Sequence, residues 1–204
     1  LPGGFSYGDD IAAGRIFASR IRHNLYPALR RFVQAGKPVI GICNGFQLLV
    51  QSGLLPGFEL PSDRPPQQSV ALSDNTNPRF VDRWVELQAE TDSHCLWTKG
   101  LGCFPLPIAH GEGRLVADEA VLDRLEAESM VALRYRHNPN GSMRDIAGIC
   151  DPTGRVLGLM PHPERAVHRC HLFDFSRRDP EVPAPGLALF QNAVEAARGA
   201  AAGA

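Results

Sequence analysis

A cysteine between two glycines is the first feature of this sequence that could do chemistry. Residues 39–49 read VIGICNGFQLL, so an apolar run ends at Cys43 inside a Gly-x-Cys-x-Gly stretch. This pattern is the thiol form of a nucleophile elbow, a sharp strand-to-helix turn in which side chains at the flanking positions would collide. The turn places the thiol at a helix N-terminus, where backbone N–H groups favour a thiolate. A buried core cysteine before a helix is the alternative, and this stretch alone leaves it open.

A candidate base for this thiol occurs in LGLMPHPERAV, residues 157–167. We predict that a strand over 155–160 continues as extended chain, so that His162 and Glu164 point to the same side. The imidazole would take the thiol proton on one ring nitrogen, while the carboxylate holds the other nitrogen and fixes the tautomer. The distance in sequence from Cys43 is no objection, because such groups assemble in space.

The same region allows a second interpretation, a metal site. Its potential ligands are His162, Glu164, His168, Cys170 and His171. Their spacing, His-x-Glu-x3-His-x-Cys-His, matches none of the usual zinc patterns. We therefore predict that the chain binds no metal.

An oxyanion hole could come from glycines at the start of the sequence, LPGGFSYGDD. Gly3 and Gly4 can present a backbone N–H that no side chain shields, and Asn44, the residue after the candidate nucleophile, supplies another. No Gly-Lys-Ser/Thr follows, so the stretch is not a phosphate loop. Two glycines alone are usually only a turn.

The elements expected to position these groups alternate between helix and strand. Helical spacing predicts helices over 22–36, 44–57, 118–128 and 184–204. Short apolar or alternating runs predict strands over 37–43, 83–88, 103–110, 114–116 and 130–135. DIAGIC-DPTG-RVLGLM, residues 145–160, predicts a hairpin, and the Pro- and Ser-rich residues 59–78 predict a loop.

Length and charge narrow the class of protein. The chain has 204 residues and a formal net charge of -1, with Lys and Arg scattered, so one compact domain over 1–204 is expected and nucleic-acid binding is not. Five cysteines without a Cys-x-x-Cys pair argue against a disulfide framework and favour the cytoplasm. No apolar stretch approaches the roughly 18 residues that suggest a membrane span.

Several stretches of the chain together resemble one family. They read LPGGFSYGDDIAAGRI, GKPVIGICNGFQLL, PIAHGEGRL, NPNGS followed by DIAGI, and VLGLMPHPERA. They are similar to the signatures of the glutaminase subunits of phosphoribosylformylglycinamidine synthase, which are class I glutamine amidotransferases of purine biosynthesis. The resemblance spans nearly the whole chain. It implies a flavodoxin-like α/β fold with three layers around a central, mostly parallel sheet.

The resemblance also implies an activity, the hydrolysis of glutamine to glutamate and ammonia through a γ-glutamyl thioester. In this reaction Cys43 would be the nucleophile, His162 the general base and Glu164 its orienting partner. The other residues that the resemblance implies are Gly4 and Asn44 for the oxyanion, and Gln47, His110, Gly111 and Glu112 for substrate binding. For His110 a satisfied loop histidine is the alternative.

The expected partner is an ATP-using synthetase subunit that accepts the ammonia and converts formylglycinamide ribonucleotide to the amidine, with a small accessory subunit as a further partner. The chain itself should need no cofactor, because ATP and Mg²⁺ belong to the synthetase. Family members carry a βαβ unit before LPGG, and we expect that this sequence lacks it.

Three alternatives to this function remain. The chain could be the glutaminase domain of a fused single-chain synthase, an amidotransferase domain for another acceptor, or an inactive truncated fragment. The full reading frame would distinguish a fused synthase from a free subunit. Glutamine turnover together with thermal melting would test whether the chain is an inactive fragment.

Overall fold

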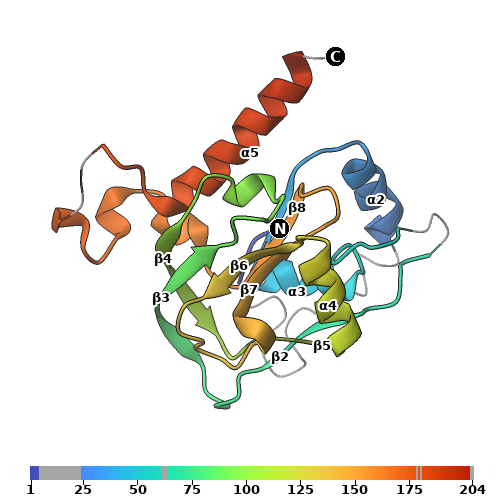
Figure 1. Cartoon of the computed structure of the whole chain (residues 1–204), viewed down its shortest axis with the longest axis horizontal. Coiled ribbons are helices and arrows are strands. Elements are labelled where there is room, and N and C mark those ends of the chain that lie inside the picture. The colour runs from blue at the N-terminus through green and yellow to red at the C-terminus, as the bar shows by residue number, and fades with distance from the viewer. Residues whose placement is uncertain (5–23, 61–63, 178, 180, 203–204) are drawn as a thin grey trace.

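The computed structural model describes residues 1–4, 24–60, 64–177, 179 and 181–202. Figure 1 shows a sheet in the middle of the molecule, with α5 running outward to the C-terminus and α2 on the opposite side of the picture. The α-helices are α2 (Tyr26–Gln34), α3 (Asn44–Gln51), α4 (Glu119–Ala127) and α5 (Pro185–Ala202). The strands are β1 (Val39–Ile42), β2 (Val70–Asp74), β3 (Val81–Ala89), β4 (Cys103–His110), β5 (Glu112–Ala117), β6 (Val131–Tyr135), β7 (Ile146–Cys150) and β8 (Val156–Leu159). Short 3₁₀ turns are η3 (Leu96–Thr98), η4 (Met143–Asp145), η5 (Pro163–Ala166), η6 (Arg169–His171) and η7 (Phe175–Arg177).

The main sheet has the strand order β1-β8-β7-β6-β3-β4, and β2 pairs with β5 in a separate ribbon. β1 and β8 are parallel, whereas the other pairs of the main sheet are antiparallel. The α/β fold is as expected. In the part of the chain that the structure describes, however, the sheet is mixed, because the β7–β8 hairpin reverses the chain direction beside β8.

Among the described strands, the candidate nucleophile and base follow the pair that is parallel, β1 and β8. β1 leads into α3 and β8 leads toward η5, and parallel strands end at the same edge of a sheet. α3 then packs against β1 and β8. Two strands far apart in the sequence thus place Cys43 and His162 at the same edge of the sheet.

Two predictions about local structure were wrong. Residues 59–78 are not all loop, because Val70–Asp74 form β2, whose pairing with β5 overrides the polar composition around it. The His-x-Glu stretch is not extended, because Pro163–Ala166 form the turn η5, with a proline at its start. The other predicted helices and strands are present. The helices end inside their predicted bounds, whereas β3 and β5 extend beyond theirs, and the hairpin is present as β7 and β8.

None of the described helices is long and apolar enough to cross a lipid bilayer.

The core beneath the site is formed by apolar side chains of α3, β7, β8 and β6, and includes Phe46, Leu49, Ile149 and Leu157. The extent of the domain, 1–204, stays a prediction.

Candidate active site

The backbone at Cys43 has the geometry of a nucleophile elbow. Its φ of 52° and ψ of -110° are unusual for a residue with a side chain, and Cys43 is the N-cap of α3. The Cys43 N–H donates to the Leu159 carbonyl at 2.9 Å, which ties the turn to the end of β8. A Cβ at Gly41 would lie 2.6 Å from the Gly45 carbonyl oxygen, and one at Gly45 would collide with the Leu1 carbonyl. The glycines are therefore required by close backbone packing, as the pattern predicts.

His162 is buried and oriented by Glu164. Its Nδ1 lies 2.6 Å from Glu164 Oε1, and its backbone N–H donates to the Pro107 carbonyl at 2.8 Å. His162 Nε2 is buried and has no hydrogen-bond partner among the described residues. A carboxylate at Nδ1 requires a proton there, so the Nε2 of the neutral ring carries a free lone pair. The predicted contact exists, although a 3₁₀ turn rather than an extended chain produces it.

Gly3 shows that the thiol and the imidazole lie next to each other. A Cβ built on Gly3 would lie 3.0 Å from His162 Cε1 and 3.1 Å from Cys43 Cβ. Gly4 follows with a φ of 122°, which few residues other than glycine adopt, and it lines the same pocket. Asn44 is the first residue of α3, where helical N–H groups lack partners within the helix. The rest of the LPGGFSYGDD motif, residues 5–10, lies outside the described residues.

One pocket collects every predicted site residue except Glu164, which stands behind His162. Its walls also include residues that the sequence analysis did not single out. The lining residues are Gly4, Cys43, Asn44, Gln47, Asp74, Pro78, Arg79, Phe80, Asp82, Ala109, His110, Gly111, Glu112, His162 and Arg165.

Gln47 connects α3 to the opposite wall of the pocket. Its Nε2 donates to the Glu112 carbonyl at 2.9 Å, and its Oε1 accepts from Asn44 Nδ2 at 3.0 Å. The side chain is 3% exposed, so these bonds fix its orientation. Gln47 is thus positioned to hold the 110–112 segment beside the thiol, in addition to any contact with substrate.

His110 is held by Asn75, a residue that the sequence analysis missed. Asn75 Nδ2 donates to the carbonyls of Arg79 and His110, both at 3.0 Å. Asn75 Oδ1 therefore lies 3.1 Å from His110 Nδ1 and accepts a hydrogen bond from Nδ1–H. Burial, and to a lesser degree His162, lowers the pKa of His110 from 6.5 to about 4. The ring is therefore neutral near pH 7, and its buried Nε2, without a partner among the described residues, is an acceptor. This arrangement favours a role in the pocket over a satisfied loop histidine.

The NPNGS motif supports the same wall from behind. Asn140 Nδ2 donates to the Gly113 carbonyl at 2.9 Å, and the Leu115 N–H donates to Ser142 Oγ at 3.1 Å. The Thr76 N–H donates to the Asn140 carbonyl at 3.0 Å. Three loops that are distant in sequence therefore form one hydrogen-bonded network around residues 110–113. The sequence analysis named NPNGS only as part of the family resemblance, and the fold shows which segment it supports.

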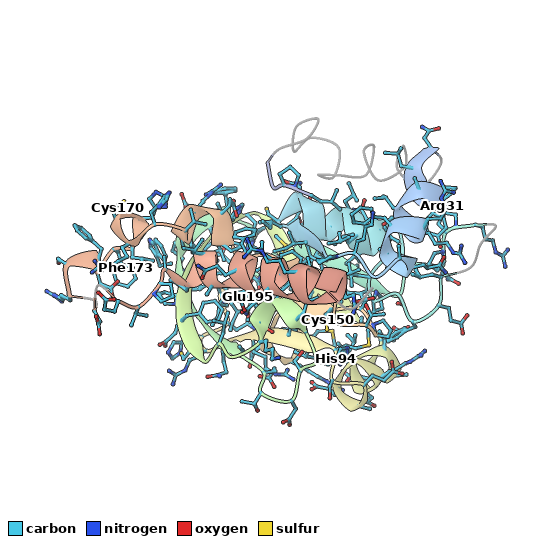
Figure 2. The ribbon with its side chains drawn as sticks, turned by 90° about the horizontal axis from the view of Figure 1, so that it is seen from above. Arg31, His94, Cys150, Cys170, Phe173 and Glu195 are labelled. Carbon is cyan, nitrogen blue, oxygen red and sulfur yellow. The ribbon has the colours of Figure 1, made fainter. Side chains whose placement is uncertain are left out.

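The other described cysteines lie outside the pocket. Figure 2 shows Cys150 beside His94, with Cys150 Sγ 3.9 Å from His94 Nε2, and it shows Cys170 near Phe173 at the far end of the molecule. Cys103 is exposed and lies 3.5 Å from Arg136 Nη1, a basic neighbour that the sequence did not suggest. Within the described ranges, no three His, Cys, Asp or Glu side chains are grouped to hold a metal ion.

Comparison with known proteins identifies the family. Residues 1–195 match the family described as CobB/CobQ-like glutamine amidotransferase domain. The chain is 42% identical to phosphoribosylformylglycinamidine synthase subunit PurQ of Methanococcus maripaludis, over 96% of this chain and 78% of that protein. It is 40% identical to the PurQ subunit of Dehalococcoides mccartyi, over 97% of this chain and 78% of that protein.

A solved structure agrees with these relatives. The structure of PurLQS from Thermotoga maritima matches with a TM-score of 0.72 and 34% identity, over 96% of this chain and 77% of that one. By this identity and coverage, the chain belongs to the CobB/CobQ-like glutamine amidotransferases and, within them, to the PurQ subunits of phosphoribosylformylglycinamidine synthase.

Proposed function

We propose that this glutamine amidotransferase subunit hydrolyses glutamine with Cys43 as the nucleophile, His162 as the general base and Glu164 as the group that orients the base. The observation that carries the proposal is the buried His162 ring, which lies close to Cys43. Its Nδ1 is held by Glu164 at 2.6 Å, and its Nε2 has no partner among the described residues. A nucleophile, a base and an orienting carboxylate in this order form a nucleophilic triad.

In the first half of the reaction, His162 Nε2 takes the thiol proton and Cys43 Sγ attacks the γ-carbonyl carbon of glutamine. The resulting oxyanion accepts hydrogen bonds from the N–H groups of Asn44 and Gly4. His162 then returns its proton to the leaving nitrogen, so the C–N bond breaks, ammonia departs and a γ-glutamyl thioester remains on Cys43.

In the second half, a water molecule gives a proton to His162 Nε2 and attacks the thioester carbonyl. The C–S bond breaks, the thiolate recovers the proton from His162, and glutamate leaves. Glu164 holds Nδ1–H and stabilises the imidazolium that forms twice in each cycle.

The ammonia has an acceptor in the proposed pathway, the synthetase subunit that converts formylglycinamide ribonucleotide to formylglycinamidine ribonucleotide. The matched structure from Thermotoga maritima is named PurLQS, and its matching chain is a homologue of this one. We propose the same kind of assembly here, with glutamine on this chain, ATP and Mg²⁺ on the synthetase, and a small accessory subunit as a further member. The chain itself is proposed to use no cofactor.

A glutamine analogue with an electrophilic diazo-ketone tests the site. We expect it to inactivate the protein and to modify Cys43 alone, whereas a general alkylating reagent would also reach the exposed Cys103 and Cys170. Mass spectrometry of the digested protein locates the adduct. Excess L-glutamine should protect, and the Cys43→Ala variant should not react. An adduct on another cysteine of the folded protein would refute the proposal.

A further inference from the structure

The pocket has a charged end that the reaction described above does not use. Arg79, Asp74 and Asp82 line it, and all three side chains are exposed. They lie within one stretch, 74–82, which connects β2 to β3 and passes over the 109–112 segment. In register, Asp74 is opposite Glu112 and Asp82 is opposite Ala109.

Arg79 is fixed on this wall through its backbone. Its carbonyl accepts a hydrogen bond from Asn75 Nδ2 at 3.0 Å, and the same amide group bonds the His110 carbonyl. Its N–H donates to the Asn77 carbonyl at 2.6 Å. Asn75 is buried, so the loop that carries Arg79 is anchored directly to the segment beside the thiol.

The guanidinium of Arg79 forms no ion pair with any residue in the described part of the chain. The second arginine of the pocket is different, because Arg165 Nε lies 3.8 Å from Glu164, the carboxylate that orients His162. Arg79 is thus the cation in the pocket whose charge is not already shared with the proposed triad.

Glutamine brings a complementary charge to such a group. Four covalent bonds separate its γ-carbonyl carbon from its α-carboxylate and its α-ammonium, so both must lie near the thiol but beyond it. A guanidinium binds a carboxylate through two parallel hydrogen bonds, and Asp74 and Asp82 supply negative charge for the ammonium. In the proposed reaction Cys43 and His162 contact only the side-chain amide of the substrate. They therefore cannot distinguish L-glutamine from other primary amides.

We propose that Arg79 binds the α-carboxylate of L-glutamine and is a specificity-determining residue of this subunit. The inference rests on the proposed function, since it concerns the substrate of the same pocket. Arg79 contributes to binding in the ground state and the transition state alike, so its loss acts on KM rather than on kcat.

Binding measurements in the Cys43→Ala background, where no turnover occurs, test the proposal. The ligands are L-glutamine, glutaramic acid, which lacks the α-ammonium, and 4-aminobutanamide, which lacks the α-carboxylate. Adding Arg79→Gln should weaken the binding of the first two at least about 10-fold, the scale of a charge-assisted hydrogen bond, and should leave 4-aminobutanamide unchanged. Arg79→Lys should recover part of the loss.

The matched control is Arg83→Gln, which removes an exposed arginine of β3 that does not line this pocket. It should leave all three affinities unchanged. In the Cys43-containing protein, Arg79→Gln should raise KM for glutamine with kcat within about twofold. Equal weakening of 4-aminobutanamide, or unchanged binding of L-glutamine, would overturn the role of Arg79. Absence of any glutamine binding or turnover with Arg79 intact would instead overturn the proposed function.

Discussion

At the residue scale, we expect His162 and Glu164 to contribute unequally to general base catalysis. In the proposed mechanism the imidazole itself accepts the proton, while the carboxylate, 42% exposed, holds Nδ1 in place. His162→Ala should therefore lower glutamine turnover by about 10² to 10⁴, the range typical of general acid–base catalysis. Glu164→Gln should be milder, because the amide oxygen can still accept the Nδ1–H bond.

Steady-state turnover of the two variants, with circular dichroism as the check on folding, measures this difference. The prediction depends on which of the two variants loses more glutamine turnover. If His162→Ala retained parental activity, or if Glu164→Gln were the more damaging, the assignment of base and orienting group would have to be abandoned.

His110 makes the stability of the protein depend on pH in a defined window. Its pKa is about 4 in the folded protein and 6.5 as an unperturbed side chain, so the unfolded chain binds the proton more readily. The contribution of neutral His110 to the free energy of unfolding is fully present above pH 6.5. It falls as the pH decreases toward 4 and is fully lost below that pH. Between pH 7.5 and 5.0 the loss should be roughly 2 kcal/mol, from 1.36 kcal/mol per pKa unit.

Chemical denaturation at the two pH values measures this effect, with His110→Asn as the comparison. The variant should lose less free energy of unfolding over the same interval, by the amount that His110 contributes. An identical pH dependence in both proteins would show that His110 is not held neutral by its surroundings.

At the element scale, the turn between β1 and α3 also positions the segment that precedes Gly4. Gly45 packs so closely on the Leu1 carbonyl that a methyl group there must displace the backbone of residues 1–4. In complex with the loaded synthetase, Gly45→Ala should therefore lower kcat by about 10² or more, because an oxyanion donor on that segment moves out of place. Its effect on the melting temperature should be modest, because the displaced segment is short.

Gly199→Ala is the matched control, since Gly199 lies in α5 with no atom near a built Cβ. It should keep full activity and melt at the same or a slightly higher temperature, as expected for glycine replaced by alanine in a helix. If Gly45→Ala kept the parental kcat, residues 1–4 would not contribute to the oxyanion hole.

The elements that carry the triad could be predicted because their signals are local. An apolar run ending in Gly-x-Cys-x-Gly specifies β1, the elbow and α3, and the DPTG turn specifies the β7–β8 hairpin. β2 was missed because its pairing with β5, rather than its own composition, makes it a strand. The conformation of His162–Glu164 was misjudged because Pro163 begins a 3₁₀ turn that alternation cannot reveal.

The supporting residues of the pocket could not be predicted for a different reason. Asn75 and Arg79 lie in a polar loop whose Asn-x-Asn-Pro sequence has the ordinary chemistry of a turn. Asn75 bonds both His110, which comes 35 residues later in the chain, and the Arg79 carbonyl, so it ties the loop of Arg79 to the segment beside the thiol. Contacts of this kind depend on the three-dimensional arrangement of strands, and a single sequence carries no local trace of them.

At the scale of the whole molecule, glutamine hydrolysis must be matched to the use of ammonia. Ammonia is a small base that becomes protonated and escapes in water, so an efficient synthase hydrolyses glutamine only when its acceptor site is filled. The Gly3–Gly4 segment is suited to such control. Gly4 adopts a φ of 122°, and no atom of the described residues lies within 4 Å of a Cβ built on it, so there is open space beside its Cα.

We therefore expect the isolated subunit to turn glutamine over slowly and the synthetase, loaded with its nucleotide ligands, to raise kcat by about 10² to 10³, the worth of one oxyanion donor. KM should change less, because Arg79, Asp74 and Asp82, which are proposed to bind the α-carboxylate and α-ammonium of glutamine, already line the pocket. Steady-state glutaminase assays with and without the loaded synthetase measure both constants. The complex with Cys43→Ala should still form the amidine when ammonium salt is supplied, which shows that the synthetase is competent. Fast turnover by the isolated subunit, unchanged by the partner, would mean that the Gly4 donor is already aligned and that another part of the assembly couples the two reactions.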